Sequence, residues 1–223
     1  MKIVAVMGSP RGMDGNTGQL LKPVLDAAAA GGAEVKTFLL SDMDVRPCRA
    51  CDCCHRSGKC RVDDDYERVR RAIEGADGLV LASPNYVFSV TAQMKAFMDR
   101  SCGALHLVAF EGKYGAAVVT SGGPESAEVE AYLLRFLRHL GVWTVGSVGA
   151  GGWQLADPAT RESLVEKAAG LGARLAEGIR RQAIFPEQQP ERRAFFDRMK
   201  ALVTLHKDEW AFEYDFWKSR GRL

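Results

Sequence analysis

Four closely spaced cysteines are the residues of this sequence best suited to chemistry. Cys48, Cys51, Cys54 and Cys60 follow the spacing C-x2-C-x2-C-x5-C. Thiolates held this close together repel one another unless a metal neutralises them, and successive C-x2-C turns let three of them reach neighbouring faces of an iron-sulfur cubane. The spacing therefore favours a 4Fe-4S cluster.

Three alternatives to a cluster stay open from the spacing alone. Zinc sites more often use two separated cysteine pairs than three ligands in quick succession. Disulfides are disfavoured because the chain otherwise has the features of a cytosolic protein, in which thiols are kept reduced. The thiols could also stay free or act as a redox switch. Cys53 lies out of register, and Cys102, in a later helix, is predicted to be a small buried hydrophobic residue.

Basic residues surround the cysteines. Only Asp52 opposes them, so the positive charge is expected to lower the thiol pKa values and to help hold an anionic cluster; a solvated basic loop is the alternative. The basic residues are Arg46, Arg49, Arg56, Lys59 and Arg61. No histidine needs a catalytic role, and only His55, among the ligands, is expected to tune a cluster through a hydrogen bond.

Length and charge exclude several classes of protein. The 223 residues, 47% of them hydrophobic, are enough for one core with a small appended segment. A formal net charge of +2 argues against binding to nucleic acid. The start of the chain lacks a signal-peptide pattern, and no apolar run approaches the roughly 18 residues that cross a bilayer. We therefore expect a cytoplasmic protein without membrane or nucleic-acid partners.

Apolar runs alternate with stretches of helical periodicity, which is typical of parallel βαβ units. The expected fold is α/β: a flavodoxin-like, doubly wound five-stranded parallel sheet, with a cysteine loop inserted after the second strand and a C-terminal helical extension. The predicted strands are 2–7, 34–39, 78–82, 114–120 and 142–148. The predicted helices are 17–30, 64–74, 91–102, 125–140 and 160–182.

The chain divides into two predicted parts. Residues 1–183 form the flavodoxin-like domain, which contains the cysteine loop 46–62. Residues 184–223 begin with a linker and continue as a helical arm rich in aromatic residues, with far more apolar bulk than a free tail needs. We expect this arm to cross a second subunit, or alternatively to fold back on its own chain.

The loop after the first predicted strand has the composition of a phosphate site. The loop runs from Met7 to Thr17, and backbone amides at the helix start, the hydroxyls of Ser9 and Thr17 and the Arg11 guanidinium can converge on one anion. The loop matches neither a dinucleotide fingerprint nor a triphosphate loop. A monophosphate such as that of FMN fits better, and an ordinary glycine-rich turn is the alternative.

Two further loops leave the sheet at the same edge. Residues 82–89 bring an aromatic pair and free amides on which a planar ring can lie, and residues 120–124 bring glycines that permit close approach. Ligands of open α/β sheets bind outside the carboxyl ends of the strands. Because the cysteine loop leaves by that edge too, we expect the two sites to be neighbours, within one subunit or across a dimer.

These motifs resemble the NAD(P)H-dependent FMN reductase-like flavodoxin-fold family, and within it the iron-sulfur flavoproteins. The resemblance rests on Gly8-Ser9-Pro10-Arg11 with Gly15-Asn16-Thr17, on Ser83-Pro84-Asn85-Tyr86, on the helix from Gln93 to Arg100, and on the cysteine motif. It implies that the FMN phosphate is held by Ser9, Arg11, Asn16 and Thr17. It implies that the isoalloxazine is lined by Pro84, Asn85, Tyr86, Val87 and Phe88, and faced from the other side by Ser121, Gly122 and Gly123. It also implies a homodimer or homotetramer.

The resemblance predicts an FMN-dependent oxidoreductase that passes electrons between a 4Fe-4S cluster and FMN to a small acceptor. A ferredoxin-type protein or NAD(P)H would be the donor. A cluster-free NAD(P)H-dependent FMN or quinone reductase is one alternative. A redox-sensing or electron-carrier protein is another, of a different class.

Overall fold

A five-stranded parallel sheet forms the centre of the computed structural model, which describes residues 1–223. Its strand order is β2-β1-β3-β4-β5, and all four pairings are parallel. The strands are β1 (Lys2–Met7), β2 (Glu34–Leu39), β3 (Gly78–Pro84), β4 (Tyr114–Ser121) and β5 (Trp143–Gly151). The predicted flavodoxin-like, doubly wound sheet is confirmed, with β1 and β2 correct to the residue.

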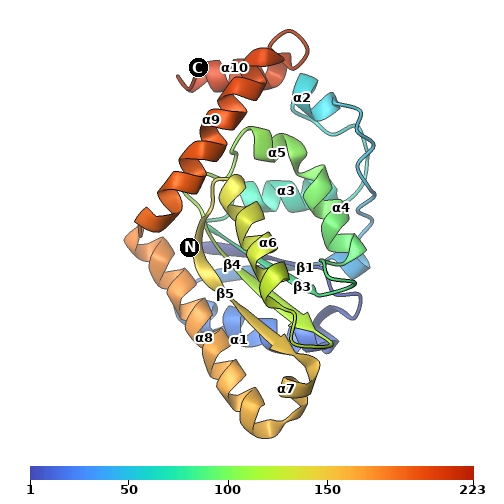
Figure 1. Ribbon diagram of the computed structural model, residues 1–223, viewed down its shortest axis with the longest axis vertical. Helices are drawn as coiled ribbons and strands as arrows, with labels where there is room; N and C mark the ends of the chain where they lie inside the picture. The colour runs from blue at the N-terminus through green and yellow to red at the C-terminus, as the bar shows by residue number, and fades with distance from the viewer.

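Helices cover both faces of this sheet (Figure 1). They are α1 (Asn16–Ala30), α2 (Cys53–Ser57), α3 (Tyr66–Glu74), α4 (Ala92–Arg100), α5 (Cys102–His106), α6 (Ala127–His139), α7 (Gly152–Ala156), α8 (Pro158–Arg181), α9 (Gln189–Leu205) and α10 (Ala211–Ser219). α1 and α8 pack on one face, and α3, α4 and α6 pack on the other. None of the helices combines the length and the apolar character needed to cross a membrane.

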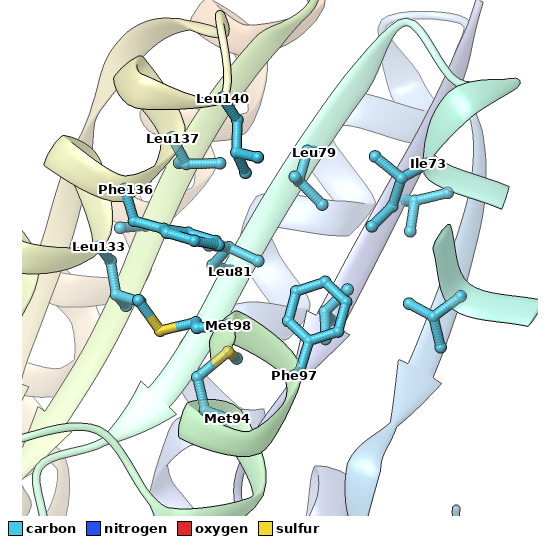
Figure 2. Packing of buried hydrophobic residues seen from close by; sticks show 14 of the residues in the cluster. Ile73, Leu79, Leu81, Met94, Phe97, Met98, Leu133, Phe136, Leu137 and Leu140 are labelled. Atoms are coloured by element: carbon cyan, nitrogen blue, oxygen red, sulfur yellow. The ribbon is translucent and has the colours of Figure 1, made fainter. Parts of the chain in front are cut away.

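The strands bury side chains on both faces, as parallel strands between two helical layers do. Along β1, Ile3 and Met7 join the cluster under α1 and α8, whereas Val4 and Val6 join the cluster under α3, α4 and α6. Figure 2 shows the second cluster, in which side chains of α4 and α6 pack against Leu79 and Leu81 of β3. The core therefore holds the strand ends, and the loops that leave them, in fixed positions.

The predicted helix 91–102 is divided in two. α4 ends at Arg100. Ser101 is its C-cap residue and donates from its hydroxyl to the Phe97 carbonyl at 2.9 Å, and α5 then begins at Cys102. A Cβ on Gly103 would lie 3.1 Å from Cys54 Cβ, so the short helix packs closely on the cysteine segment. The break redirects the chain toward residues that are distant in sequence, and the local periodicity carries no sign of it.

The C-terminal arm, α9 and α10, packs on its own chain, which is the second of the two arrangements considered from the sequence. A separate hydrophobic cluster joins it to the segment after α5, with members Val108, Phe195, Met199, Val203 and Trp217. The fully buried Trp217 donates from Nε1 to the His106 carbonyl at 3.1 Å. The predicted linker contains a short 3-10 turn, Pro186–Gln188, and α9 begins directly after it. In Figure 1, α10 lies beside α2 at the end of the molecule farthest from α7.

Candidate functional site

A cavity of about 170 Å³ lies where β1, β3 and β4 end. The strand order reverses between β1 and β3, and this is the place where open parallel sheets bind their ligands. The lining residues come from the loops after these strands and from the start of α7. They are Ser9, Arg11, Gly15, Asn16, Thr17, Pro84, Asn85, Tyr86, Thr120, Ser121, Gly122 and Gly152.

One end of this cavity is the amino-terminal end of α1. Gly15 occupies the N-cap position, so no side chain caps the amides of the first turn. The buried Ser9 hydroxyl accepts from the Arg11 backbone N–H at 3.2 Å, and the hydroxyls of Thr17 and Thr120 lie 2.7 Å apart. Uncapped N–H groups, the positive end of the helix dipole and an arginine together make a site for an anion.

The other end of the cavity is bordered by a tight turn. The Tyr86 amide donates to the Ser89 carbonyl at 2.8 Å, and the Ser89 amide donates back at 3.1 Å. Between them, Val87 and Phe88 have φ angles of 49° and 63°, and their side chains are 91% and 74% exposed. A left-handed backbone is strained for a β-branched residue, and such strain is typical of segments that hold a ligand.

Asn85 carries an unpartnered acceptor at this cavity. Its Nδ2 donates to the Glu125 carbonyl at 2.7 Å, but its buried Oδ1 has no hydrogen-bond partner. A buried acceptor without a partner costs free energy, about 1–3 kcal/mol, so it indicates a donor that a ligand would supply.

Nine of the twelve residues predicted for a flavin site line this cavity. The other three are Val87 and Phe88, at the exposed tip of the turn, and Gly123, whose carbonyl accepts from the Ser121 hydroxyl. Sequence reasoning did not select Gly15, Thr120 and Gly152, which also line the cavity. Gly15 and Thr120 stand in the quoted loops and could have been chosen. Gly152 had no signal, because α7 is too short to predict.

The four motif cysteines line a second cavity, of about 290 Å³. Left-handed backbone at Ala50, Asp52 and Gly58, with φ of 47°, 56° and 71°, folds the loop around it. All of the cysteines are free thiols. A hydrogen bond from the Cys53 backbone is the main influence that lowers the pKa of the Cys51 thiol, which favours its thiolate form. The four thiols are close in sequence, and the loop directs all of them into one cavity.

Arg100 and Asp64 form a fully buried ion pair at this cavity, with Nη1 and Oδ2 2.6 Å apart. Burial acts to raise the pKa of Asp64, but the hydrogen bonds from Arg100 and from the Arg46 and Tyr66 amides outweigh it and hold the pKa below its usual value. Arg100 Nε is buried and has no partner. A buried cation with a free N–H beside four thiols favours an anionic occupant.

Cys102 is not the inert hydrophobic residue that the sequence predicted. Its Sγ lies 4.0 Å from His55 Nε2 and 3.7 Å from His106 Nε2. The hydrogen bonds with His106 and then His55 lower the pKa of Cys102 to about 6. The signal that could have found this arrangement is the Cys-x3-His spacing of residues 102 and 106, which puts both side chains on one face of a helix.

The two cavities lie at opposite ends of α4. The Thr91 hydroxyl, which caps this helix, donates to the Gly8 carbonyl at 2.6 Å beside the first cavity, whereas Arg100 lines the second. At about 1.5 Å per residue, the nine residues of α4 extend about 14 Å. In Figure 1 the segment after β2 runs past α4 to reach α2. Within one chain the two sites are therefore separated by a helix rather than in contact.

Comparison with known proteins identifies the family. The model of the NADPH-dependent FMN reductases matches residues 1–154, which include the whole of the first cavity. This chain belongs to the NADPH-dependent FMN reductase family. It is a flavin-dependent oxidoreductase with the flavodoxin-like fold, and the resemblance seen in its motifs is confirmed.

Two curated relatives are named iron-sulfur flavoproteins. An iron-sulfur flavoprotein of Archaeoglobus fulgidus is 33% identical over 227 residues, which cover 99% of both chains. An iron-sulfur flavoprotein of Methanocaldococcus jannaschii is 37% identical over 130 residues, 56% of this chain and 67% of the other. Because the first match covers nearly the whole of both chains, this family member lies in the iron-sulfur flavoprotein subgroup.

Solved structures agree with the fold. A flavodoxin from the domain Archaea superposes with a TM-score of 0.53 at 18% identity, covering 81% of this chain and 99% of the other. Identity this low shows a shared fold and nothing finer.

Proposed function

We propose that this protein is an electron-transfer iron-sulfur flavoprotein, which passes electrons between a 4Fe-4S cluster and FMN to a small acceptor. The cysteine cavity carries the proposal, because Cys48, Cys51, Cys54 and Cys60 line one space beside the unpartnered Nε of Arg100. Four thiolates are the donor set of such a cluster, and N–H donors near its sulfurs tune its potential. The residues present therefore fit a cluster.

The first cavity fits FMN. The uncapped amides of α1 with Ser9, Arg11, Asn16 and Thr17 would hold the phosphate. The unpartnered Asn85 Oδ1 would accept a hydrogen bond from an N–H of the ring. Residues 84–88 would line the isoalloxazine, and residues 121–123 would face its other side.

When bound, FMN supplies transfer of hydride or single electrons and the cluster supplies single electrons, so together they convert one mode into the other. The side chains of this protein set the spacing, the exclusion of water and the hydrogen bonds. No acid-base side chain is required for that work. The donor would be a ferredoxin-type protein or NAD(P)H, and the cytoplasm, where the free thiols stay reduced, would be the location.

A homodimer or homotetramer is part of the proposal. Val87 and Phe88 expose apolar side chains at the rim of the flavin cavity, where a second subunit would cover them. The length of α4, which separates the two cavities of one chain, also supports an oligomer. The cluster of a second subunit can lie nearer to the flavin than the cluster of the same chain.

Anaerobic purification followed by quantification of iron, sulfide, zinc and flavin tests the proposal. We expect about four irons and four sulfides with one FMN per chain, and a visible spectrum in which both groups contribute. Flavin without iron would overturn the cluster and leave the flavin site intact.

A cluster-free NAD(P)H-dependent FMN or quinone reductase is the second candidate. The match to a family described as NADPH-dependent favours it. Stopped-flow reduction separates the two: rapid bleaching of the flavin by NADPH in an iron-free protein supports this candidate. Reduction by a one-electron donor that requires the motif cysteines supports the first.

The third candidate, a redox sensor or carrier, draws on the arm. The Phe212 ring of α10 lies against Gly58 of the cysteine segment, where a Cβ would come within 2.4 Å of it. Binding of a partner that did not depend on the redox state of the protein would exclude this candidate.

A further inference from the structure

Three potential metal ligands meet outside the cysteine motif. His55 of α2, together with Cys102 and His106 of α5, brings two imidazole nitrogens and one thiol sulfur within 4.8 Å of one another. None of the three belongs to the C-x2-C-x2-C-x5-C pattern. Figure 1 shows that α2 and α5 are adjacent at this end of the molecule, with α10 beside them.

The spacing of these atoms matches tetrahedral coordination. Zinc holds thiolate sulfur at about 2.3 Å and imidazole nitrogen at about 2.0–2.1 Å, so tetrahedral angles place sulfur and nitrogen about 3.6 Å apart. The observed separations from Cys102 Sγ are 3.7 Å to His106 Nε2 and 4.0 Å to His55 Nε2. The two sulfur–nitrogen separations therefore lie within about 0.4 Å of the values that a tetrahedral ion needs.

Glu213 of α10 orients both rings. Its Oε1 lies 2.5 Å from His55 Nδ1 and its Oε2 lies 3.1 Å from His106 Nδ1, and the carboxylate is fully buried. With both Nδ1 atoms on this carboxylate, both Nε2 atoms face the thiol. A carboxylate that accepts from the outer nitrogen of a histidine ligand is the usual support of a metal site.

We propose that His55, Cys102 and His106, none of which belongs to the cysteine motif, bind one divalent ion of the zinc type, oriented by Glu213. The ligand set is two imidazoles and one thiolate, which leaves a fourth position for water or a small ligand. His55 and Cys102 also line the cysteine cavity, so the ion would lie beside the motif, and it would hold the arm against α2 and α5.

The surroundings suit such an ion. Trp210 shields the two rings, with centroids 4.7 Å from His55 and 5.2 Å from His106. Cys102 also lines a cavity of about 490 Å³ that reaches Arg135 and Arg198, which gives the ion a path of entry.

Zinc analysis of the holoprotein tests the proposal. Anaerobically purified protein receives excess Zn²⁺, is dialysed, and is analysed for zinc, iron and FMN per chain. His106→Gln and Cys102→Ala remove ligands. His206→Gln is the matched control, because His206 also stacks on Trp210 but pairs with Glu209 outside the site. We expect one zinc in the wild type and in the control, none in the two ligand variants, and the same iron and FMN in all four.

Zinc K-edge X-ray absorption identifies the ligands in the wild type, so this measurement does not depend on whether a variant folds. One sulfur at about 2.3 Å with nitrogen or oxygen at about 2.0 Å supports the site, and a four-sulfur shell would place the zinc on the motif and overturn it. Zinc that persists in His106→Gln, or iron lost from Cys102→Ala, would overturn it as well. The iron content reports on the proposed cluster separately, so failure of one idea does not imply failure of the other.

Glu213→Gln tests the positioning role. Removing the carboxylate that orients a histidine ligand typically weakens metal binding about 10- to 100-fold. We therefore expect the variant to bind one zinc with a dissociation constant raised by that factor, measured by competition with a chromophoric chelator. An unchanged dissociation constant would overturn the role of Glu213.

Discussion

The flavin cavity and the cysteine region are built in different ways. The flavin cavity is lined mostly by small and polar residues from three loops, each of which directly follows a strand of the sheet. The cysteine region combines a loop without regular structure with α2, α5 and α10, which lie far apart in sequence. The first depends on backbone groups, and the second on thiols, imidazoles and buried charges.

The two sites are therefore vulnerable to different substitutions. Backbone amides at the end of a buried strand stay in place when a side chain is changed, because the core under them is unaffected. A cluster of buried side chains loses its partners when one member is removed, and unpaired buried groups are costly. We therefore expect substitutions in the cysteine region to have the larger effects.

The largest effect is expected from Cys60→Ser. Loss of one motif thiol should remove most of the iron, because a hydroxyl is a poor ligand for a cluster. FMN content should stay unchanged, since no motif cysteine lines the flavin cavity. Iron and flavin analysis of the anaerobic protein provides the measurement. Cys53→Ser is the control, and equal loss of iron from both variants would show that the motif assignment is wrong.

Trp217→Ala should have the next largest effect. This side chain is fully buried between the arm and α5, and truncating a buried tryptophan costs about 3–5 kcal/mol. In urea unfolding, the arm of the variant should be released at a lower urea concentration than the arm of the wild type. Flavin fluorescence should show that the flavin cavity is still intact at that concentration. Leu205→Ala in α9, where the side chain is 77% exposed, is the control. Simultaneous loss of flavin and arm would mean that the two regions are coupled.

Arg11→Ala should weaken FMN binding about 10-fold, because an exposed charge-assisted hydrogen bond to phosphate is worth about 1.5 kcal/mol. The dissociation constant of FMN, measured by fluorescence titration, gives the result. Arg71→Ala removes the same charge from the exposed side of α3 and should bind FMN as the wild type does. If the two variants bind FMN equally, Arg11 does not contact the phosphate.

The smallest effect is expected from acidification at the arm. Burial is the main cause that lowers the pKa of His139, although Glu191 opposes it, and the ring stacks on Phe195 at 4.1 Å. Because the folded-state pKa is below that of the unfolded chain, about 6.5, this contribution is present above that pH and is lost as pH falls. Docking of the arm should therefore weaken slightly between pH 7.5 and 5.

Urea unfolding of wild type and His139→Gln at both pH values isolates that contribution. The variant should lose less of its arm stability on acidification, because glutamine does not titrate. Equal losses in the two proteins would assign the acid sensitivity to other groups of the arm.

Particular elements show how far the sequence could be used for prediction. β1 and β2 are correct to the residue because turn residues mark their limits: Gly8 and Ser9 follow β1, and Gly31 and Gly32 precede β2. The helix after β3 was predicted as one piece, yet it breaks at Ser101, where packing of Gly103 on Cys54 decides the direction of the chain. A contact between residues 49 positions apart leaves no periodic signal.

The sheet, its flanking helices, the phosphate-type loop and the presence of a cysteine centre are predictable from the amino-acid sequence, because each of these depends on neighbouring residues. The remaining features come from the three-dimensional packing. It placed the flavin cavity and the cysteine cavity at opposite ends of α4, docked the arm on its own chain, and brought Cys102 to His55 and His106. These features depend on packing between segments up to 158 residues apart, as in the hydrogen bond that the Glu213 carboxylate accepts from His55, and no local pattern encodes such a distance.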